Sequence, residues 1–84
     1  MNKLTYSDVI GIKAEYKNTT RVGKNVYNVH FCTADGTIEG PFAVFGYLLD
    51  CWKIRRGQNC GRYTITTHTT PTGREIIDTI NPNT

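Results

Sequence analysis

The sequence predicts an α+β fold, in which a small, mostly antiparallel sheet packs around one amphipathic helix in the order β-β-β-α-β-β. Two observations support this prediction. Segments with alternating apolar and polar residues lie on both sides of a single apolar stretch that has helical periodicity. Residues that favour tight turns separate the alternating segments at short intervals, as in β-hairpins. With 84 residues, the chain has room for one domain, residues 1–84, and one small core.

The first strand is expected from Ile10, where apolar and polar residues begin to alternate strictly. Its apolar face is expected to contain Ile10, Ile12, Ala14 and Tyr16. The polar stretch Asn18–Lys24 has the composition of a turn and leads into a second alternating segment, Val26–Thr33. One face of this second strand is expected to point into the core with Tyr27, Val29 and Phe31.

A hairpin with a two-residue turn is expected at Asp35-Gly36. With Ala34 opposite Thr37, the register pairs Thr33 with Ile38, Phe31 with Gly40, Val29 with Phe42, and Tyr27 with Val44. The third strand then extends through Phe42–Val44, and the large apolar residues of both strands share one side. Gly40-Pro41 is also a suitable start for the helix, as cap and first helical residue. The strand is preferred, and Pro41 must then lie on an edge or direct its missing N–H outward.

Pro41–Gly57 is the only long apolar segment, and its second part predicts an amphipathic helix over Phe45–Arg56. The apolar stripe, at positions i, i+3, i+4 and i+7, consists of Phe45, Leu48, Leu49 and Trp52. Basic residues follow in the last turn, where cations complement the carbonyl-rich end of a helix: Lys53, Arg55 and Arg56. Gly57 is expected to adopt the left-handed conformation that stops the helix.

Two more strands are expected after the helix. Arg62–Thr70 is rich in β-branched residues, Thr70–Gly73 suits a type I turn, and Arg74–Ile80 closes a second hairpin. Asn81-Pro82 is expected to end the ordered chain. The element order resembles that of a small, partly open oligonucleotide/oligosaccharide-binding (OB) barrel, with the helix between strands three and four. Other small sheets covered by one helix share this order, so the resemblance concerns the order alone.

The charge balance permits nucleic acid as a partner without requiring it. Ten Lys and Arg side chains against seven Asp and Glu give a formal net charge of +3. No apolar run approaches the roughly 18 residues that a membrane-spanning helix needs, so no membrane partner is expected. Three cysteines, an odd number, fit a reducing compartment better than a disulfide framework, and a cytoplasmic location is expected.

The sequence contains few motifs for catalysis or cofactor binding. The cysteines and the two histidines lack the paired spacing of a zinc site, and no glycine-rich phosphate loop occurs. Cys60, His68 and Glu75 form the only local set with the residue types of a nucleophilic triad, and the simplest register places His68 opposite Glu75. We interpret these two as an exposed cross-strand polar pair. Neither an enzyme nor a bound metal or cofactor is predicted.

Two surfaces are candidates for function, and the first is basic. It surrounds the end of the helix and the next strand and consists of Lys53, Arg55, Arg56 and Arg62. We expect these four charges to lie on one rim, where they suit phosphates. Binding of single strands also needs rings that stack on bases. The available rings are assigned mainly to the core side: Tyr16, Tyr27, Trp52 and Tyr63.

The second candidate is the polar face of the fourth strand, from which Thr64, Thr66 and His68 project between Arg62 and Thr70. An ordinary solvated sheet face is the simplest interpretation. If this threonine-rich strand is exposed, it is also a natural docking edge, because its unpaired N–H and C=O groups can accept a strand from a partner.

The leading functional hypothesis is a small non-enzymatic interaction protein that docks on a larger macromolecule and blocks or regulates it, as phage and mobile-element accessory proteins do. Its main partner is then a protein, and a homodimer through an exposed strand is a further alternative. The second hypothesis is an OB-like protein that binds single-stranded nucleic acid, based on element order, net positive charge and the basic group.

Overall fold

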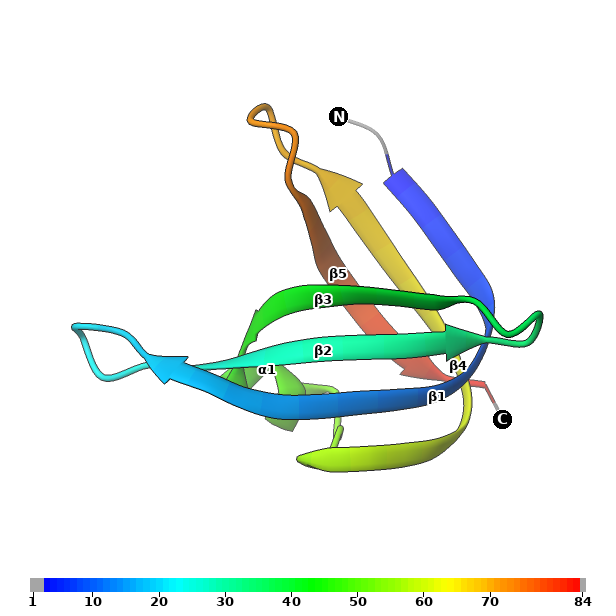
Figure 1. The fold of residues 1–84 in the computed structure, drawn as a ribbon, viewed down its shortest axis with the longest axis horizontal. Coiled ribbons are helices and arrows are strands. Elements are labelled where there is room, and N and C mark those ends of the chain that lie inside the picture. The colour runs from blue at the N-terminus through cyan, green and yellow to red at the C-terminus, as the bar shows by residue number, and fades with distance from the viewer. Residues whose placement is uncertain (1–2, 84) are drawn as a thin grey trace.

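The computed structural model describes residues 3–83, which form a strongly curved, five-stranded antiparallel sheet with one short helix (Figure 1). The elements are β1 (Lys3–Thr19), β2 (Asn25–Thr33), β3 (Ile38–Phe45), α1 (Gly46–Cys51), β4 (Gly57–Thr69) and β5 (Glu75–Pro82). The strand order in the sheet is β3-β2-β1-β4-β5, so β1 is central and β3 and β5 are the edges. The predicted order of strands and helix is confirmed.

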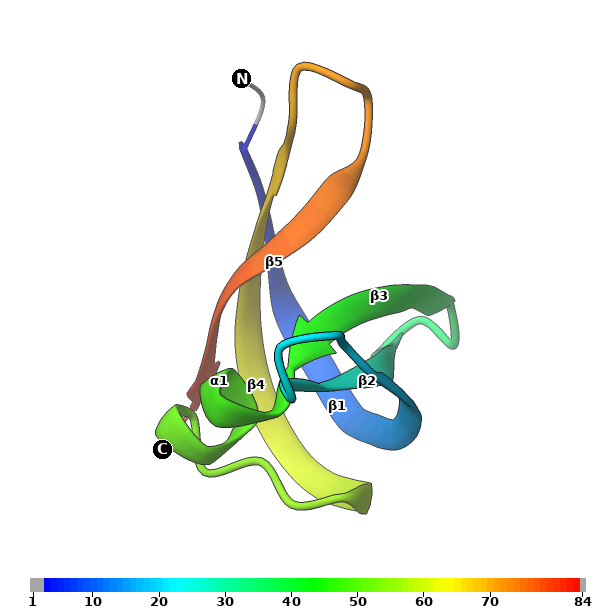
Figure 2. The same cartoon turned by 90° about the vertical axis from the view of Figure 1, so that its left-hand side faces the viewer.

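The sheet curls because β1 belongs to both of its halves. This strand of 17 residues pairs with β4 from Lys3 to Ala14 and with β2 from Val9 to Thr19. Both ladders shift register between Val9 and Gly11, and such irregularities bend a strand and increase its twist. The half formed by β3, β2 and β1 therefore lies at an angle to the half formed by β1, β4 and β5 (Figure 2). The result is an open half-barrel, which confirms the OB-like fold class.

Three hairpin turns share a Thr-x-x-Gly sequence and one geometry. The threonines, Thr20, Thr33 and Thr70, each accept the N–H of the glycine three residues later at 2.9 to 3.0 Å. Each also donates its own N–H to the carbonyl four residues later. The glycines have φ between 83° and 89°, the left-handed position that ends a three-residue loop. The predicted turn at Thr70–Gly73 is confirmed, whereas the turn after β2 has three residues and not two.

The β2–β3 register matches the prediction away from the turn and differs close to it. Val29 pairs with Phe42 as expected, but Phe31 lies opposite Glu39 and not Gly40. One extra residue of β3 lies between these pairs and cancels the shift caused by the longer turn. Gly40 is required there, because its φ is 121° and a β-carbon would lie 2.7 Å from the carbonyl oxygen of Val29.

The core lies between the two halves of the sheet and draws on every strand and on the helix. It consists of Val9, Ile12, Ala14, Val29, Phe31, Phe42, Val44, Leu49, Ile54, Ile65, Ile77 and Ile80. Phe31 packs edge-on against Tyr6 with ring centroids 4.9 Å apart, and stacks on Phe42 at 5.5 Å. The predicted inward faces are confirmed for β2 and for the middle of β1.

The ends of the first predicted strand behave differently. Ile10 is 41% exposed and Tyr16 is 59% exposed, although both were expected in the core. The register shift beside Val9 buries this valine and turns Ile10 outward. Tyr16 lies where β1 enters the first hairpin, beyond the reach of the second half-sheet. Alternation thus identified the strand only from Ile10 onward, whereas β1 begins at Lys3, and it did not show where the buried part of the strand begins and ends.

The helix is much shorter than predicted, because it ends in a Schellman motif. The N–H of Ile54 donates to the C=O of Leu49 at 2.9 Å, and the N–H of Lys53 donates to the C=O of Asp50 at 3.1 Å. Lys53 adopts the left-handed conformation, with φ 59°, that was expected of Gly57. The turn brings Ile54 back into the core, where it is 3% exposed.

Burial of an apolar side chain just after the helix therefore outweighs the strain of a lysine with positive φ. The predicted span Phe45–Arg56 was wrong, and no basic residue lies in the last turn of α1. Of the predicted apolar stripe, Leu49 is fully buried, Leu48 and Trp52 are half-buried, and Phe45 is exposed.

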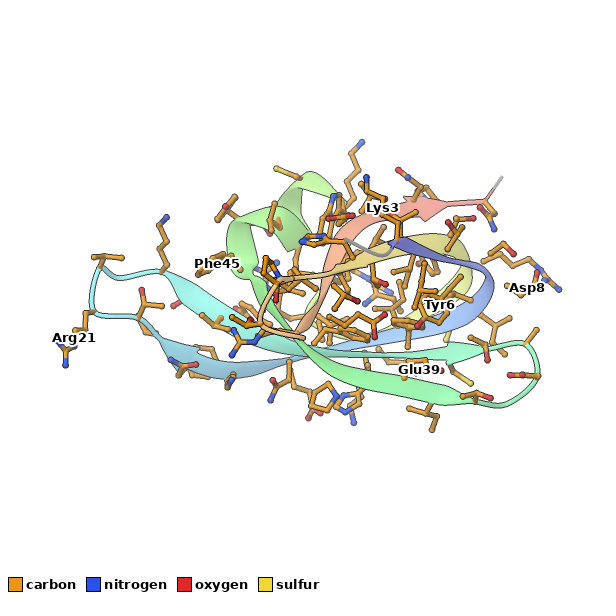
Figure 3. The ribbon with its side chains drawn as sticks, turned by 90° about the horizontal axis from the view of Figure 1, so that it is seen from above. Lys3, Tyr6, Asp8, Arg21, Glu39 and Phe45 are labelled. Atoms are coloured by element: carbon orange, nitrogen blue, oxygen red, sulfur yellow. The ribbon has the colours of Figure 1, made fainter. Side chains whose placement is uncertain are left out.

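A polar network within the fold centres on the half-buried carboxylate of Glu75. Thr67 Oγ1 donates to Glu75 Oε2 at 2.6 Å, and the hydroxyl of Tyr6 donates to the same oxygen at 3.1 Å. Thr67 is fully buried, so this bond satisfies its hydroxyl. Tyr6 lies among the side chains between the half-sheets (Figure 3), and burial together with Glu75 raises the pKa of Tyr6 to about 12.

We expect the raised pKa of Tyr6 to destabilise the fold as pH rises from about 10 to about 12. In the unfolded chain Tyr6 ionises near its ordinary pKa of 10.0, whereas in the folded protein it keeps its proton until about 12. The unfolded state therefore loses the proton first and gains in relative stability. Urea midpoints measured across this pH range should decline more steeply for wild type than for Tyr6→Phe. Parallel declines would contradict the prediction.

Candidate nucleic-acid interface

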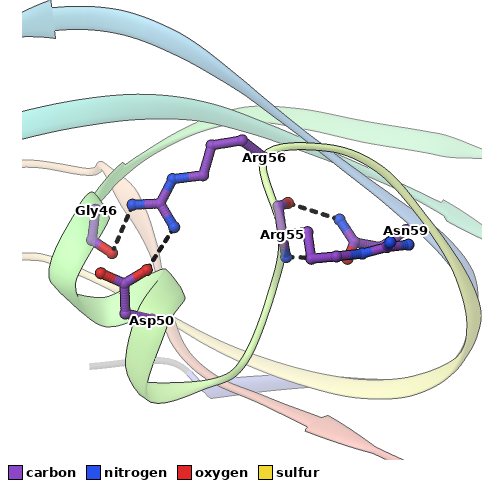
Figure 4. Close-up of polar contacts among 5 residues, drawn as sticks. All are labelled: Gly46, Asp50, Arg55, Arg56 and Asn59. Atoms are coloured by element: carbon purple, nitrogen blue, oxygen red, sulfur yellow. Dashed lines mark hydrogen bonds and ion pairs between the residues drawn. The ribbon is translucent and has the colours of Figure 1, made fainter.

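Arg56 makes more contacts than any other member of the predicted basic group. Its Nη1 pairs with Asp50 Oδ1 at 2.6 Å, and its Nη2 donates to the carbonyl of Gly46 at 3.3 Å (Figure 4). The guanidinium lies over the ring of Tyr27, with Cζ 4.6 Å from the centroid. Contacts with Tyr27 and with Asp50 raise the pKa of Arg56. The side chain is therefore positioned between α1 and β2.

The segment between α1 and β4 is held by Asn59, a residue that the sequence pattern did not single out. Its Oδ1 accepts the N–H of Arg55 at 3.0 Å, and its Nδ2 donates to the carbonyl of Arg55 at 2.8 Å (Figure 4). The side chain of Asn59 also donates to the carbonyl of Gly57, and Asn59 is only 4% exposed. These bonds fix the main chain of Arg55 while Arg55 itself stays exposed.

The other two predicted cations, Lys53 and Arg62, are exposed. Lys53 lies in the turn that ends α1, and Arg62 lies in β4, where its carbonyl accepts the N–H of Asn83 at 2.8 Å. Within residues 3–83, no ion pair or hydrogen bond holds the side chain of Lys53, Arg55 or Arg62, so no contact places these charges relative to Arg56. A single rim formed by all four charges stays a prediction.

The predicted polar face of β4 exists, and each of its three central side chains has a partner. Thr64 Oγ1 donates to Asn83 Oδ1 at 2.7 Å, Thr66 shares a hydrogen bond of 2.6 Å with Thr79, and His68 Nδ1 pairs with Asp78 Oδ1. The strand itself is not an edge, because it pairs with β1 on one side and with β5 on the other. The predicted docking edge at Thr64, Thr66 and His68 was therefore wrong.

The residues of the suggested triad are not brought together. His68 lies opposite Ile76 and Glu75 lies opposite Thr69, so the expected cross-strand pair of His68 and Glu75 was wrong. Cys60 pairs with Gly11 and His68 with Lys3 along the same ladder, which separates them by roughly 26 Å of strand. Among the described residues, no three His, Cys, Asp or Glu side chains are grouped as metal ligands.

Exposed aromatic rings are the main feature that the sequence analysis missed. Tyr16 is 59% exposed, Tyr47 is 54% exposed and Phe45 is 36% exposed. Phe45 and Tyr47 stack on each other with centroids 5.7 Å apart, and Lys24 Nζ lies 5.5 Å from the Phe45 centroid and 5.8 Å from that of Tyr47. Single exposed apolar side chains are common on protein surfaces, whereas exposed rings that lie together mark an interaction site.

These rings and the nearby cations form one connected surface where the first hairpin meets α1. Tyr16 packs edge-on against Tyr27 at 5.9 Å, and Arg56 connects Tyr27 to the start of the helix. Phe45 and Tyr47 flank that same point of the chain, Gly46. We call this surface the aromatic–basic rim and define it as Tyr16, Lys24, Tyr27, Phe45, Tyr47 and Arg56.

The sequence contained one signal for part of the rim, namely two aromatic residues close together, Phe45 and Tyr47, where a strand passes into a helix. Neither the strand period nor the helix period applies across such a junction, so neither pattern alone justifies assigning these two side chains to the core. The helical wheel assigned Phe45 to the core because it assumed that the helix had already begun there. No sequence pattern indicated Lys24, because the fold of the first hairpin brings it over the distant rings of Phe45 and Tyr47.

The chain matches no family model, curated protein or solved structure in comparisons with known proteins. The geometry itself defines the class: a small α+β domain with an OB-like, five-stranded half-barrel and one short helix between β3 and β4. No helix in residues 3–83 has the length and apolar character needed to cross a bilayer.

Proposed function

We propose that this protein binds single-stranded nucleic acid through the aromatic–basic rim of its OB-like half-barrel. The observation that carries the proposal is the exposure of Phe45 and Tyr47 beneath Lys24, and of Tyr16 beside Tyr27, which carries Arg56 on its ring. Such rings offer stacking platforms for bases, and adjacent cations attract the phosphates between them. The role is binding, without a catalytic step.

The charges around the rim favour a polyanion. Lys24 has no carboxylate partner among the described residues, and Lys53 and Arg55 add exposed charge beyond the end of α1. Among residues 3–83, Asp50 is the only acidic side chain with an ion pair or hydrogen bond to the rim, and it pairs with Arg56. Arg56 also stacks on Tyr27, so its charge is held beside a ring in the geometry that suits a phosphate next to a stacked base.

Stacking on a ring depends little on which base is bound, because every base has a π-face. We therefore propose binding with little sequence preference. Three free cysteines among the described residues agree with a reducing location, and a cytoplasmic site of action forms part of the proposal.

Salt dependence is the direct test of this proposal. If Lys24, Lys53, Arg55 and Arg56 each neutralise a phosphate, a plot of log K against log salt should have a slope of about −3. Fluorescently labelled oligo(dT) titrated at several salt concentrations gives this slope. Lys24→Gln should weaken binding and make the slope shallower by about 0.7. Lys3→Gln, which removes a charge at the far end of β1, is the matched control and should change neither.

Absence of binding to DNA and RNA oligonucleotides even at low salt would reject the proposal. The second candidate would then be the docking and blocking of a larger protein. One observation favours it, namely that β3 and β5 are both free sheet edges.

A further inference from the structure

An apolar groove lies between the two free edges of the half-barrel. It has a volume of about 650 Å³. Its lining includes residues 41–45 of β3, Tyr47 and Leu48 of α1, and residues 74–77, which form the start of β5 and the position before it. No backbone hydrogen bond joins β3 to β5 in residues 3–83, so the groove separates two unpaired edges. Figure 2 shows the hairpin of β4 and β5 rising past the end of β3.

The backbone of β3 offers hydrogen-bonding groups to this groove. Bonded and non-bonded pairs alternate along an antiparallel ladder, and the turn marks Thr33 and Thr37 as a bonded pair. Counting along β2 from Thr33 makes Val29 and Phe42 a bonded pair as well. Ala43 therefore directs its N–H and C=O away from β2, toward the open side, and Phe45 directs its N–H there, while the C=O of Phe45 begins α1 as its N-cap. These three outward groups are a suitable template for an added strand.

The charges at the groove are positive. Lys17 and Arg74 line it, and Lys24 lies over Phe45 and Tyr47. Of the described residues that line the groove, Glu75 alone is acidic, and its carboxylate accepts hydrogen bonds from Tyr6 and Thr67 within the fold. A ligand in the groove thus meets an apolar floor and a cationic margin.

We infer that this groove binds an extended peptide segment of a partner protein, with alternating acidic and apolar residues, as an additional strand along β3. The apolar side chains would contact Ile77 on the core side of β5, while the acidic ones would face Lys17 and Arg74. Alternation is required because successive side chains of a strand point to opposite sides. The groove shares Phe45, Tyr47 and Lys24 with the aromatic–basic rim, but the inference rests on the backbone edge of β3 and on the contacts with β5, which the rim does not include.

The test uses a synthetic peptide of about eight residues that alternates Asp and Val. Amide chemical shifts of the labelled protein should move at Ala43, Phe45 and Ile76 during the titration, with saturation. A Lys–Val peptide of equal length should produce no such shifts. Arg74→Glu should weaken binding several-fold, whereas Lys3→Glu, which lies outside the groove, should have no effect.

Hydrogen bonding along the edge of β3 is tested by changing first the protein and then the peptide. Ala43→Pro removes an outward N–H at an exposed position and should abolish binding while the remaining spectrum stays that of a folded protein. A peptide N-methylated at alternate residues tests the same bonds without changing the protein, and it should bind only when the methyl groups face away from β3.

Several results would overturn the inference. Equal binding of Asp–Val and Lys–Val peptides would exclude charge recognition, and undiminished binding to Ala43→Pro would exclude strand addition. Oligo(dT) that displaces the peptide and moves the amides of Ala43 and Ile76, which lie outside the aromatic–basic rim, would assign the groove to nucleic acid. A concentration-dependent dimer that protects Ala43 would assign it to a second copy of the chain. A protein that binds the peptide but no oligonucleotide would reject the proposed function and leave this inference standing.

Discussion

Replacing both Tyr16 and Tyr47 by alanine is expected to weaken oligo(dT) binding by about 2–6 kcal/mol, which is roughly 30-fold or more. Stacking of one base on an aromatic ring contributes about 1–3 kcal/mol, and these rings are 59% and 54% exposed. They lie at opposite ends of the aromatic–basic rim, so each should contact a different base. The measurement is a fluorescence titration at one fixed salt concentration.

Two controls separate stacking from structural damage. Tyr16→Phe/Tyr47→Phe keeps both rings and should bind nearly as well as wild type. Ile38→Ala removes a side chain that is 70% exposed at the other end of β3 and should leave affinity unchanged. Full affinity in the double alanine variant would show that the exposed rings do not form the binding surface.

Phe31→Ala is expected to lower the free energy of unfolding by about 3–5 kcal/mol. Its side chain is 1% exposed and contacts the rings of Tyr6 and Phe42, so truncation leaves a cavity at the centre of the core. A domain this small has a limited total stability, and much of the variant should be unfolded at room temperature. Urea denaturation followed by circular dichroism measures the change.

The matched control for this substitution is Ile10→Ala. Ile10 is 41% exposed on the outer side of β1, and its truncation should change stability by about 0.5 kcal/mol or less. Phe31→Leu should fall between the two, because it keeps part of the buried volume. A loss below about 1 kcal/mol in Phe31→Ala would contradict the central position of this ring in the core.

Alternation in the sequence predicted the inward faces of β2 and of the middle of β1, because a strand directs successive side chains to opposite sides. It also identified the order of the elements and the hairpin at Thr70–Gly73. It could not place Ile10 or Tyr16, since a register shift near Val9 and the end of the second half-sheet decide which part of β1 is covered. These are long-range effects that no local pattern contains.

The candidate site was predictable only in part. The basic residues after the helix were visible in the sequence, but their contacts were not: Arg56 stacks on Tyr27 of a different strand, and Lys24 reaches Phe45 and Tyr47 across a hairpin. Threonines and a histidine on β4 suggested a docking edge. The strand order places β4 inside the sheet and makes β3 and β5 the free edges.

Periodicity and local turn chemistry were sufficient to predict the middle of each strand, the places of the three hairpins and the presence of one helix. They missed residues 3–9 of β1 and the first residues of β4, and they made the helix too long. The tertiary structure alone decided the end of that helix, at the left-handed Lys53, because burial of Ile54 against the core is a long-range contact. It also decided which rings stay exposed and which edges stay open, since both follow from how the curved halves of the sheet meet.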